Sequence, residues 1–127
     1  MTLFIERRHL ERFNIPAAEV YYRQEAGFRD CVAIEARGKM VDLTVKGVRF
    51  EADQKLCPGA RIQVEIHVPD REVIALKGNV LWVGRVQDQG PLFAVVGFLD
   101  YADEPGYNPR QSLKQLEELR DKYNGQE

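Results

Sequence analysis

The sequence has few of the side chains on which enzyme chemistry depends. Its 127 residues include two cysteines, two histidines and a single serine, Ser112. Neither His9 nor His67 has a partner at the spacing of a metal-binding motif. The sequence contains no phosphate-binding glycine loop and no nucleophile-elbow motif. These absences argue against catalysis, and we expect neither an enzyme nor a bound cofactor or metal.

The chain also lacks an excess of charge of either sign. It has 18 basic and 20 acidic side chains, for a formal net charge of -2. This balance excludes a globally basic protein that binds nucleic acid non-specifically, so we expect no DNA or RNA partner. Any site for an anion must come from a local basic cluster.

Long apolar runs are missing as well. The longest, residues 92–99, is far shorter than the roughly 20 residues of a membrane-spanning helix. The first residues, MTLFIERR, carry charge where a signal peptide is apolar. We therefore expect a cytoplasmic protein without membrane insertion. In such a protein Cys31 and Cys57, which form no CxxC motif, are expected to be reduced core thiols.

What the sequence does contain is the pattern of an antiparallel β-protein. The length favours one domain over residues 1–127, since domains most often hold about 100–150 residues. Between residues 17 and 100, short runs of alternating apolar and polar side chains are separated by turn residues. This pattern predicts strands near residues 18–26, 29–43, 47–52, 62–68, 73–86 and 91–100.

The C-terminal part changes to a helical period. Asn108-Pro109 is a suitable helix start. Apolar side chains then recur at helical spacing, at Leu113, Leu116, Leu119 and Tyr123. The predicted helix spans about residues 109–123 and would cover one end of a β-barrel.

Two short motifs are candidates for a binding site. Arg8-His-Leu-Glu-Arg12 is an RxxxR pair, which this composition produces about once by chance. Asp42-Leu-Thr44-Val-Lys-Gly47 matches [DN]x[ST]xxG, which a random chain of this composition contains about 0.02 times. A purely structural reading of the second motif is a hairpin turn. In that reading the Asp and Thr side chains bind local backbone and Gly47 takes a positive φ.

Together these motifs resemble those of the PilZ domain family. Here 29 residues separate Arg12 from Asp42, which fits the family's spacing. The segment GNVLWV at residues 78–83 is similar to the family's GRVVWV strand, and FAVVGFLD at residues 93–100 is similar to its closing strand. The resemblance covers about residues 6–123.

The resemblance implies a mainly β fold and a receptor for the bacterial second messenger cyclic di-GMP. The implied fold is a six-stranded antiparallel β-barrel, about residues 16–101, with a C-terminal α-helix. A flexible segment of about residues 1–15 carries the RxxxR motif. The implied ligand-binding residues are Arg8, Arg12, Asp42, Thr44 and Gly47.

These residue types suit a ligand with two phosphates and two guanines. The arginine fork matches phosphate oxygens or the O6/N7 edge of guanine, and its plane stacks on the base. A carboxylate such as Asp42 accepts hydrogen bonds from the N1–H and amino group of guanine. Thr44 stands where the family usually has serine and keeps the hydroxyl, whereas Lys46 stands where a small residue is common. Within the resembling family, a long basic side chain before the RxxxR accompanies two stacked ligands, so Arg7 favours two ligands per chain. The alternative is an exposed ion pair of Arg7 with Glu6 or Glu11.

Two other functions stay open on the sequence alone. One is a PilZ-like adaptor that acts by protein contact without binding ligand. The other is a small barrel that binds single-stranded nucleic acid through aromatic side chains. Trp82 and Phe50 would serve that function, but their alternating strand positions are more typical of core residues, and the chain is acidic overall. As a receptor, the protein would signal by a conformational change to a protein partner that the sequence does not identify, as a monomer or weak homodimer.

Overall fold

A computed structural model of the chain describes residues 12–27 and 29–124. Within these residues six strands are followed by one helix. The strands are β1 (Glu19–Gln24), β2 (Ile34–Leu43), β3 (Gly47–Glu51), β4 (Arg61–His67), β5 (Ile74–Arg85) and β6 (Leu92–Phe98). The helix is α2 (Arg110–Asn124).

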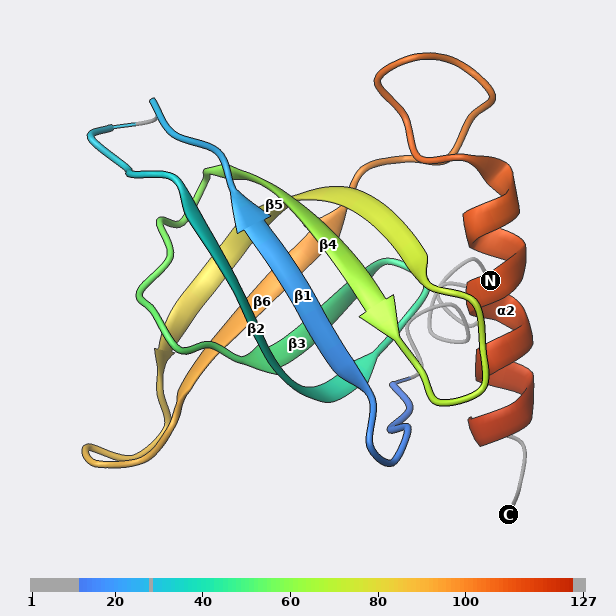
Figure 1. The fold of residues 1–127 in the computed structure, drawn as a ribbon, viewed down its shortest axis with the longest axis horizontal. Coiled ribbons are helices and arrows are strands. Elements are labelled where there is room, and N and C mark those ends of the chain that lie inside the picture. Colours follow the sequence, from blue (N-terminus) through green and yellow to red (C-terminus); the bar gives the residue numbers. More distant parts are fainter. Residues whose placement is uncertain (1–11, 28, 125–127) are drawn as a thin grey trace, which may run out of the picture.

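The six strands form a closed barrel in the order β1-β2-β3-β6-β5-β4. Every neighbouring pair is antiparallel, and β1 closes the barrel by pairing with β4 as well as with β2. Closure leaves no strand edge unpaired. The predicted six-stranded antiparallel barrel with a C-terminal helix is thus confirmed (Figure 1).

Alternation along the strands builds the core inside this barrel. In β4 the side chains of Ile62, Val64 and Ile66 are buried while those between them face outward. The rings of Tyr22 and Phe50 meet in the interior with their centroids 4.8 Å apart. Each fully buried side chain of this size contributes about 1.5–3 kcal/mol through removal from water.

Helix α2 lies at one end of the barrel, the end that also carries the turn between β2 and β3 (Figure 1). Leu116 and Leu119, on the face predicted from the sequence, are 0% and 2% exposed and belong to the core. None of the helices in the described part of the chain is long and apolar enough to cross a membrane.

The strand predictions differ most from the structure at the start of β2. The sequence predicted a strand from residue 29, but β2 begins at Ile34. Arg29 and Asp30 take positive φ angles of 47° and 65°. This left-handed conformation cannot continue a strand, so the chain turns there before it enters β2.

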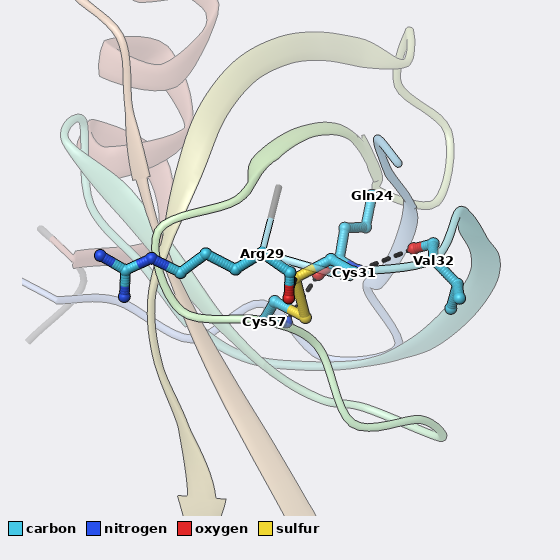
Figure 2. The surroundings of a disulfide bond; sticks show 5 residues. All are labelled: Gln24, Arg29, Cys31, Val32 and Cys57. Atoms are coloured by element: carbon cyan, nitrogen blue, oxygen red, sulfur yellow. Dashed lines mark hydrogen bonds between the residues drawn. A yellow bond between two sulfur atoms is a disulfide. The ribbon is translucent and has the colours of Figure 1, made fainter. Parts of the chain in front are cut away.

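The expectation of two reduced thiols is wrong, because Cys31 and Cys57 form a disulfide (Figure 2). Their Cα atoms are 6.2 Å apart, and the bond joins the β1–β2 loop to the segment between β3 and β4. Buried Gln24 connects the same two segments: its Nε2 donates to the Val32 carbonyl and its Oε1 accepts from the Cys57 N–H, at 3.0 and 2.6 Å. The 26-residue separation in sequence carries no spacing signal for this pairing.

Candidate functional site: the β2–β3 turn and its surroundings

The turn between β2 and β3 contains the [DN]x[ST]xxG motif, and Thr44 organises it. The Thr44 hydroxyl oxygen accepts hydrogen bonds from the backbone N–H groups of Lys46 and Gly47, both at 3.0 Å. The Thr44 N–H in turn donates to the Gly47 carbonyl at 2.9 Å. Donation from the hydroxyl to that carbonyl spans 3.4 Å, which is long for an O–H···O bond. The hydroxyl proton of Thr44 can therefore reorient toward a ligand without opening the turn.

Gly47 is required for a different reason from the one predicted. Its φ angle is not among the positive ones, so the expectation of a left-handed glycine is wrong. A Cβ atom at this position would come within 2.5 Å of the Val96 carbonyl oxygen on β6. Glycine here lets β3 approach β6 closely and so holds the turn against the barrel wall.

The hairpin reading expected the Asp42 side chain to bind local backbone, but the carboxylate pairs with Arg49 instead. These residues face each other across β2 and β3, and Arg49 Nη2 donates to Asp42 Oδ2 at 2.5 Å. The carboxyl side chain is 17% exposed and the guanidinium side chain 38%. Arg49 Nε is buried and has no hydrogen-bond partner among the described residues. The pair fixes the direction of the Asp42 carboxylate while leaving part of it accessible.

Arg49 was not among the residues predicted from the sequence, although a signal for it was present. In a hairpin whose turn residues are Thr44 to Gly47, Leu43 must face Val48, and the next pair outward is Asp42 with Arg49. Counting the register from the predicted turn would have found this pair. Opposite charges that face each other directly across two antiparallel strands interact favourably.

Arg12 lies beside this turn because the next residue is paired with β2. Phe13 and Leu43 form an antiparallel bridge through two backbone hydrogen bonds, at 3.0 and 2.9 Å. Phe13 is 4% exposed, and Asn14 Nδ2 donates to the Val41 carbonyl at 2.5 Å. The side chain of Arg12 is exposed at the end of this bridge. The structure thus brings Arg12 together with Asp42, Thr44 and Gly47, whereas Arg7 and Arg8 lie outside the described residues.

An aromatic side chain extends the same outer wall of the barrel. Registers across β2, β3, β6 and β5 align Asp42 with Arg49, Arg49 with Val95, and Val95 with Trp82. Trp82 is 45% exposed, so the sequence-based placement of this residue in the core is wrong, while Phe50 is buried as expected. The cause is a bulge between Val80 and Trp82 that turns the indole outward.

The local charge of this surface differs from that of the whole chain. Arg12 and Lys46 are exposed, and Arg49 is partly so, whereas the chain carries a net charge of -2. Guanidinium groups can bind an anion that also offers N–H donors when they lie beside an oriented carboxylate and a hydroxyl held only by a long hydrogen bond. The described residues contain no cluster of three side chains suited to a metal ion.

A hollow of about 690 Å³ lies elsewhere on the barrel. Its walls come from β1, β2, β4 and β5, including Tyr21 and Arg37, and from Tyr107 ahead of α2. None of the described candidate residues lines it. These residues lie instead around the β2–β3 turn.

Comparisons with known proteins agree with this fold. The sequence matches the family model of the PilZ domain over residues 6–116. None of the curated proteins compared with the sequence matches it.

Two solved structures share the fold at low sequence identity. The Bacillus subtilis inhibitor of motility, MotI/DgrA, is 10% identical with a TM-score of 0.62, over 91% of this chain and 51% of that chain. This chain therefore spans about half the length of that protein. The PilZ domain of YcgR from Escherichia coli, solved with c-di-GMP, is 15% identical with a TM-score of 0.60, over 91% of this chain and 89% of that chain.

Proposed function

We propose that this chain, because it belongs to the PilZ domain family, is a receptor for cyclic di-GMP. PilZ domains are receptor or adaptor domains and not enzymes. The observation that carries the receptor proposal is the bridge between Phe13 and Leu43, which brings the end of the RxxxR motif to the [DN]x[ST]xxG turn. Arg12, which 29 residues separate from Asp42 in sequence, thereby comes next to the second motif.

In the proposed complex each side chain has a role that its chemistry suits. Arg8 and Arg12 bind phosphate oxygens or the O6/N7 edge of guanine. Asp42, oriented by Arg49, accepts hydrogen bonds from the guanine N1–H and amino group. Thr44 donates its hydroxyl proton, and Gly47 keeps the turn close to the barrel.

The ligand would then join the RxxxR segment to the barrel and so change the surface that a partner protein meets. Ordering a residue of that segment costs about 1–2 kcal/mol in backbone entropy. Several charge-assisted hydrogen bonds, at about 1.5–3 kcal/mol each, offset this cost and leave micromolar or tighter binding. We propose that the conformational change passes the signal to a protein partner.

Titration calorimetry with cyclic di-GMP tests the receptor proposal. We expect micromolar or tighter binding that weakens as salt rises. Cyclic di-AMP should bind much more weakly, because adenine lacks the N1–H and 2-amino groups that would donate hydrogen bonds to Asp42. Arg12→Ala should lower the affinity at least about tenfold, because one lost charge-assisted contact is worth at least about 1.4 kcal/mol. The exposed Arg71 lies beyond β4, and Arg71→Ala is the matched control that should bind normally.

The absence of heat at about 100 µM cyclic di-GMP would overturn the receptor proposal and favour the adaptor function. One structural observation supports that second candidate. Leu81, Trp82 and Val86 on and just after β5 are 62%, 45% and 78% exposed, which suits contact with another protein. An adaptor would use this apolar surface without ligand.

The number of ligands per chain is a separate part of the proposal. Two stacked molecules of cyclic di-GMP carry four phosphate charges and expose additional guanine faces. A third guanidinium can neutralise part of this charge and stack on one of these faces. We therefore assign Arg7 to the site and propose two ligands per chain. Equilibrium dialysis at saturation should give two for the wild type and one for Arg7→Ala, and one ligand per wild-type chain would remove Arg7 from the site.

A further inference from the structure

The β2–β3 turn is held from behind by a tyrosine that follows β6. Tyr101 Oη donates a hydrogen bond to the carbonyl oxygen of Val45 at 2.6 Å. Val45 lies in the middle of the [DN]x[ST]xxG motif and is 3% exposed. The bond therefore reaches the inner side of the turn whose outer side presents Thr44.

A second hydrogen bond connects the same two segments. The N–H of Phe98, the last residue of β6, donates to the Lys46 carbonyl at 2.8 Å. The Val45 carbonyl thus accepts from the stretch that follows β6, and the Lys46 carbonyl accepts from the last residue of β6 itself. The backbone that positions the Thr44 hydroxyl is fixed by this stretch as well as by the hairpin itself.

The stretch between β6 and α2 is in turn anchored to the barrel. The side-chain Oδ1 of buried Asn108 accepts from the Lys77 N–H at 2.7 Å. Its Nδ2 donates to the carbonyls of Lys77 and Leu99, at 3.0 and 2.9 Å. Ala102 N–H donates to the Asn108 carbonyl at 2.9 Å. Helix α2 begins two residues later, at Arg110. A displacement at Tyr101 would consequently act on the start of α2.

The environment of Tyr101 keeps its phenol protonated. Burial raises the pKa of Tyr101, and the negative charge of Glu117 on α2 raises it further. The hydroxyl remains a hydrogen-bond donor to Val45 throughout the neutral range. Tyr101 also packs against the hydrophobic core to which Leu116 and Leu119 of α2 belong.

We propose that Tyr101 is a positioning residue that sets the β2–β3 turn for ligand and couples ligand binding to helix α2. Without the hydroxyl, the buried Val45 carbonyl loses its partner and the turn must shift to find another. Coupling between two places is reciprocal, so a ligand that holds the turn also steadies the stretch that leads to α2. The coupling rests on the proposed receptor function, whereas the positioning of the turn does not.

The test compares Tyr101→Phe, which removes only the hydroxyl, with Tyr107→Phe. Tyr107 is 43% exposed in the same stretch and provides the matched control. In the wild type, cyclic di-GMP should slow amide hydrogen exchange in the α2 residues 112–119. Tyr101→Phe should bind at least about fivefold more weakly and lose this slowing, while Tyr107→Phe should behave as the wild type.

A measurement without ligand separates this inference from the receptor proposal. The N–H groups of Lys46 and Gly47 should exchange faster in Tyr101→Phe than in Tyr107→Phe, by more than the difference in global stability that urea unfolding measures for the two variants. Unchanged exchange at these two amides overturns the positioning role, whatever the protein binds. Ligand that binds the wild type without slowing exchange in α2 overturns the coupling, whether or not the variant folds. Failure of the wild type to bind cyclic di-GMP overturns the receptor proposal and leaves the exchange result at the turn interpretable.

Discussion

Asp42 has two partners to satisfy, Arg49 in the structure and guanine in the proposed complex. Asp42→Ala removes the acceptor for both. We expect the affinity for cyclic di-GMP to fall at least about tenfold, since a charge-assisted hydrogen bond is worth about 1.5–3 kcal/mol. The free energy of unfolding should fall by less than about 1 kcal/mol, because ion pairs with solvent access contribute little and Arg49 is 38% exposed. Calorimetry and urea unfolding measure the two effects separately.

The opposite pattern would assign Asp42 a structural role. If Asp42→Ala bound normally and unfolded more easily, this carboxylate would serve only to hold Arg49 on the barrel wall. Arg49→Ala is then the informative second variant. It leaves the carboxylate in place but without its orienting partner, so in a ligand site it should weaken binding by less than Asp42→Ala does.

Thr44 combines a structural role with the proposed binding role in one oxygen atom. Thr44→Ser keeps that oxygen, and we expect both stability and affinity close to those of the wild type. Thr44→Val keeps the shape and loses the acceptor for two backbone N–H groups. It should lower the free energy of unfolding by about 1 kcal/mol and weaken ligand binding. Equal affinities for Thr44→Ser and Thr44→Val would show that the hydroxyl serves the turn alone.

At the scale of single residues, prediction from sequence succeeded where a residue's structural role depends on its neighbours in the chain. The turn residues were found because [DN]x[ST]xxG is rare in a random chain, and Thr44 does cap its own turn. Gly47 was found for the wrong reason, since its constraint comes from Val96 on a strand distant in sequence. Trp82 was misplaced because a single bulge reverses the face that alternation assigns.

At the scale of elements, the six strands and the helix were all predicted, with bounds that differ by a few residues. Alternation finds a strand when one face is buried, as in β4 (Arg61–His67). It does not find a turn inside an apparent run, and residues 29–33 were therefore assigned to β2 although Arg29 and Asp30 are left-handed. The strand order could not be read from alternation either, and the family resemblance supplied the six-stranded barrel without predicting its strand order.

The disulfide between Cys31 and Cys57 ties the β1–β2 loop to the segment between β3 and β4. A covalent link over a sequence separation of 26 restricts the unfolded chain, and reduction should lower the free energy of unfolding by about 3.5 kcal/mol. The measurement is urea unfolding with and without dithiothreitol. Cys57→Ser provides the control, because its stability should not respond to the reductant.

The disulfide should leave ligand binding unchanged. It lies at the end of the barrel away from the β2–β3 turn, and Gln24 still connects the two loops when the bond is reduced (Figures 1 and 2). We expect the affinity for cyclic di-GMP to be equal in both redox states. A several-fold change would show that the two ends of the barrel are coupled.

At the scale of the whole molecule, the two ends of the barrel are built differently. One end is closed by the disulfide and the buried Gln24. At the other end Phe13, the β2–β3 turn, Tyr101 and α2 contact one another through backbone carbonyls and core side chains. The candidate binding surface therefore lies on the end that holds the segments leading to both termini, where a ligand can act on more than one of them.

Two tyrosines, the buried Tyr22 and the partly buried Tyr101, should make the stability of the whole fold fall at alkaline pH. Burial raises the pKa of both Tyr22 and Tyr101 above the ordinary value of 10.0. Above that pH the unfolded chain releases protons that the folded chain retains, so the folded state binds more protons and its stability falls as pH rises. The contribution is fully present below pH 10.0 and is lost between that value and the raised folded pKa.

Urea unfolding between about pH 8 and about pH 11 should therefore show a loss of up to about 1.4 kcal/mol per pH unit for each such tyrosine at the upper end. Tyr101→Phe removes one of the two groups and should flatten the decline, although it lowers stability at neutral pH through the unpaired Val45 carbonyl. Tyr107→Phe changes an exposed tyrosine and should leave the slope as in the wild type. An equal slope in Tyr101→Phe and the wild type would show that the Tyr101 phenol ionises as easily in the folded protein as in water.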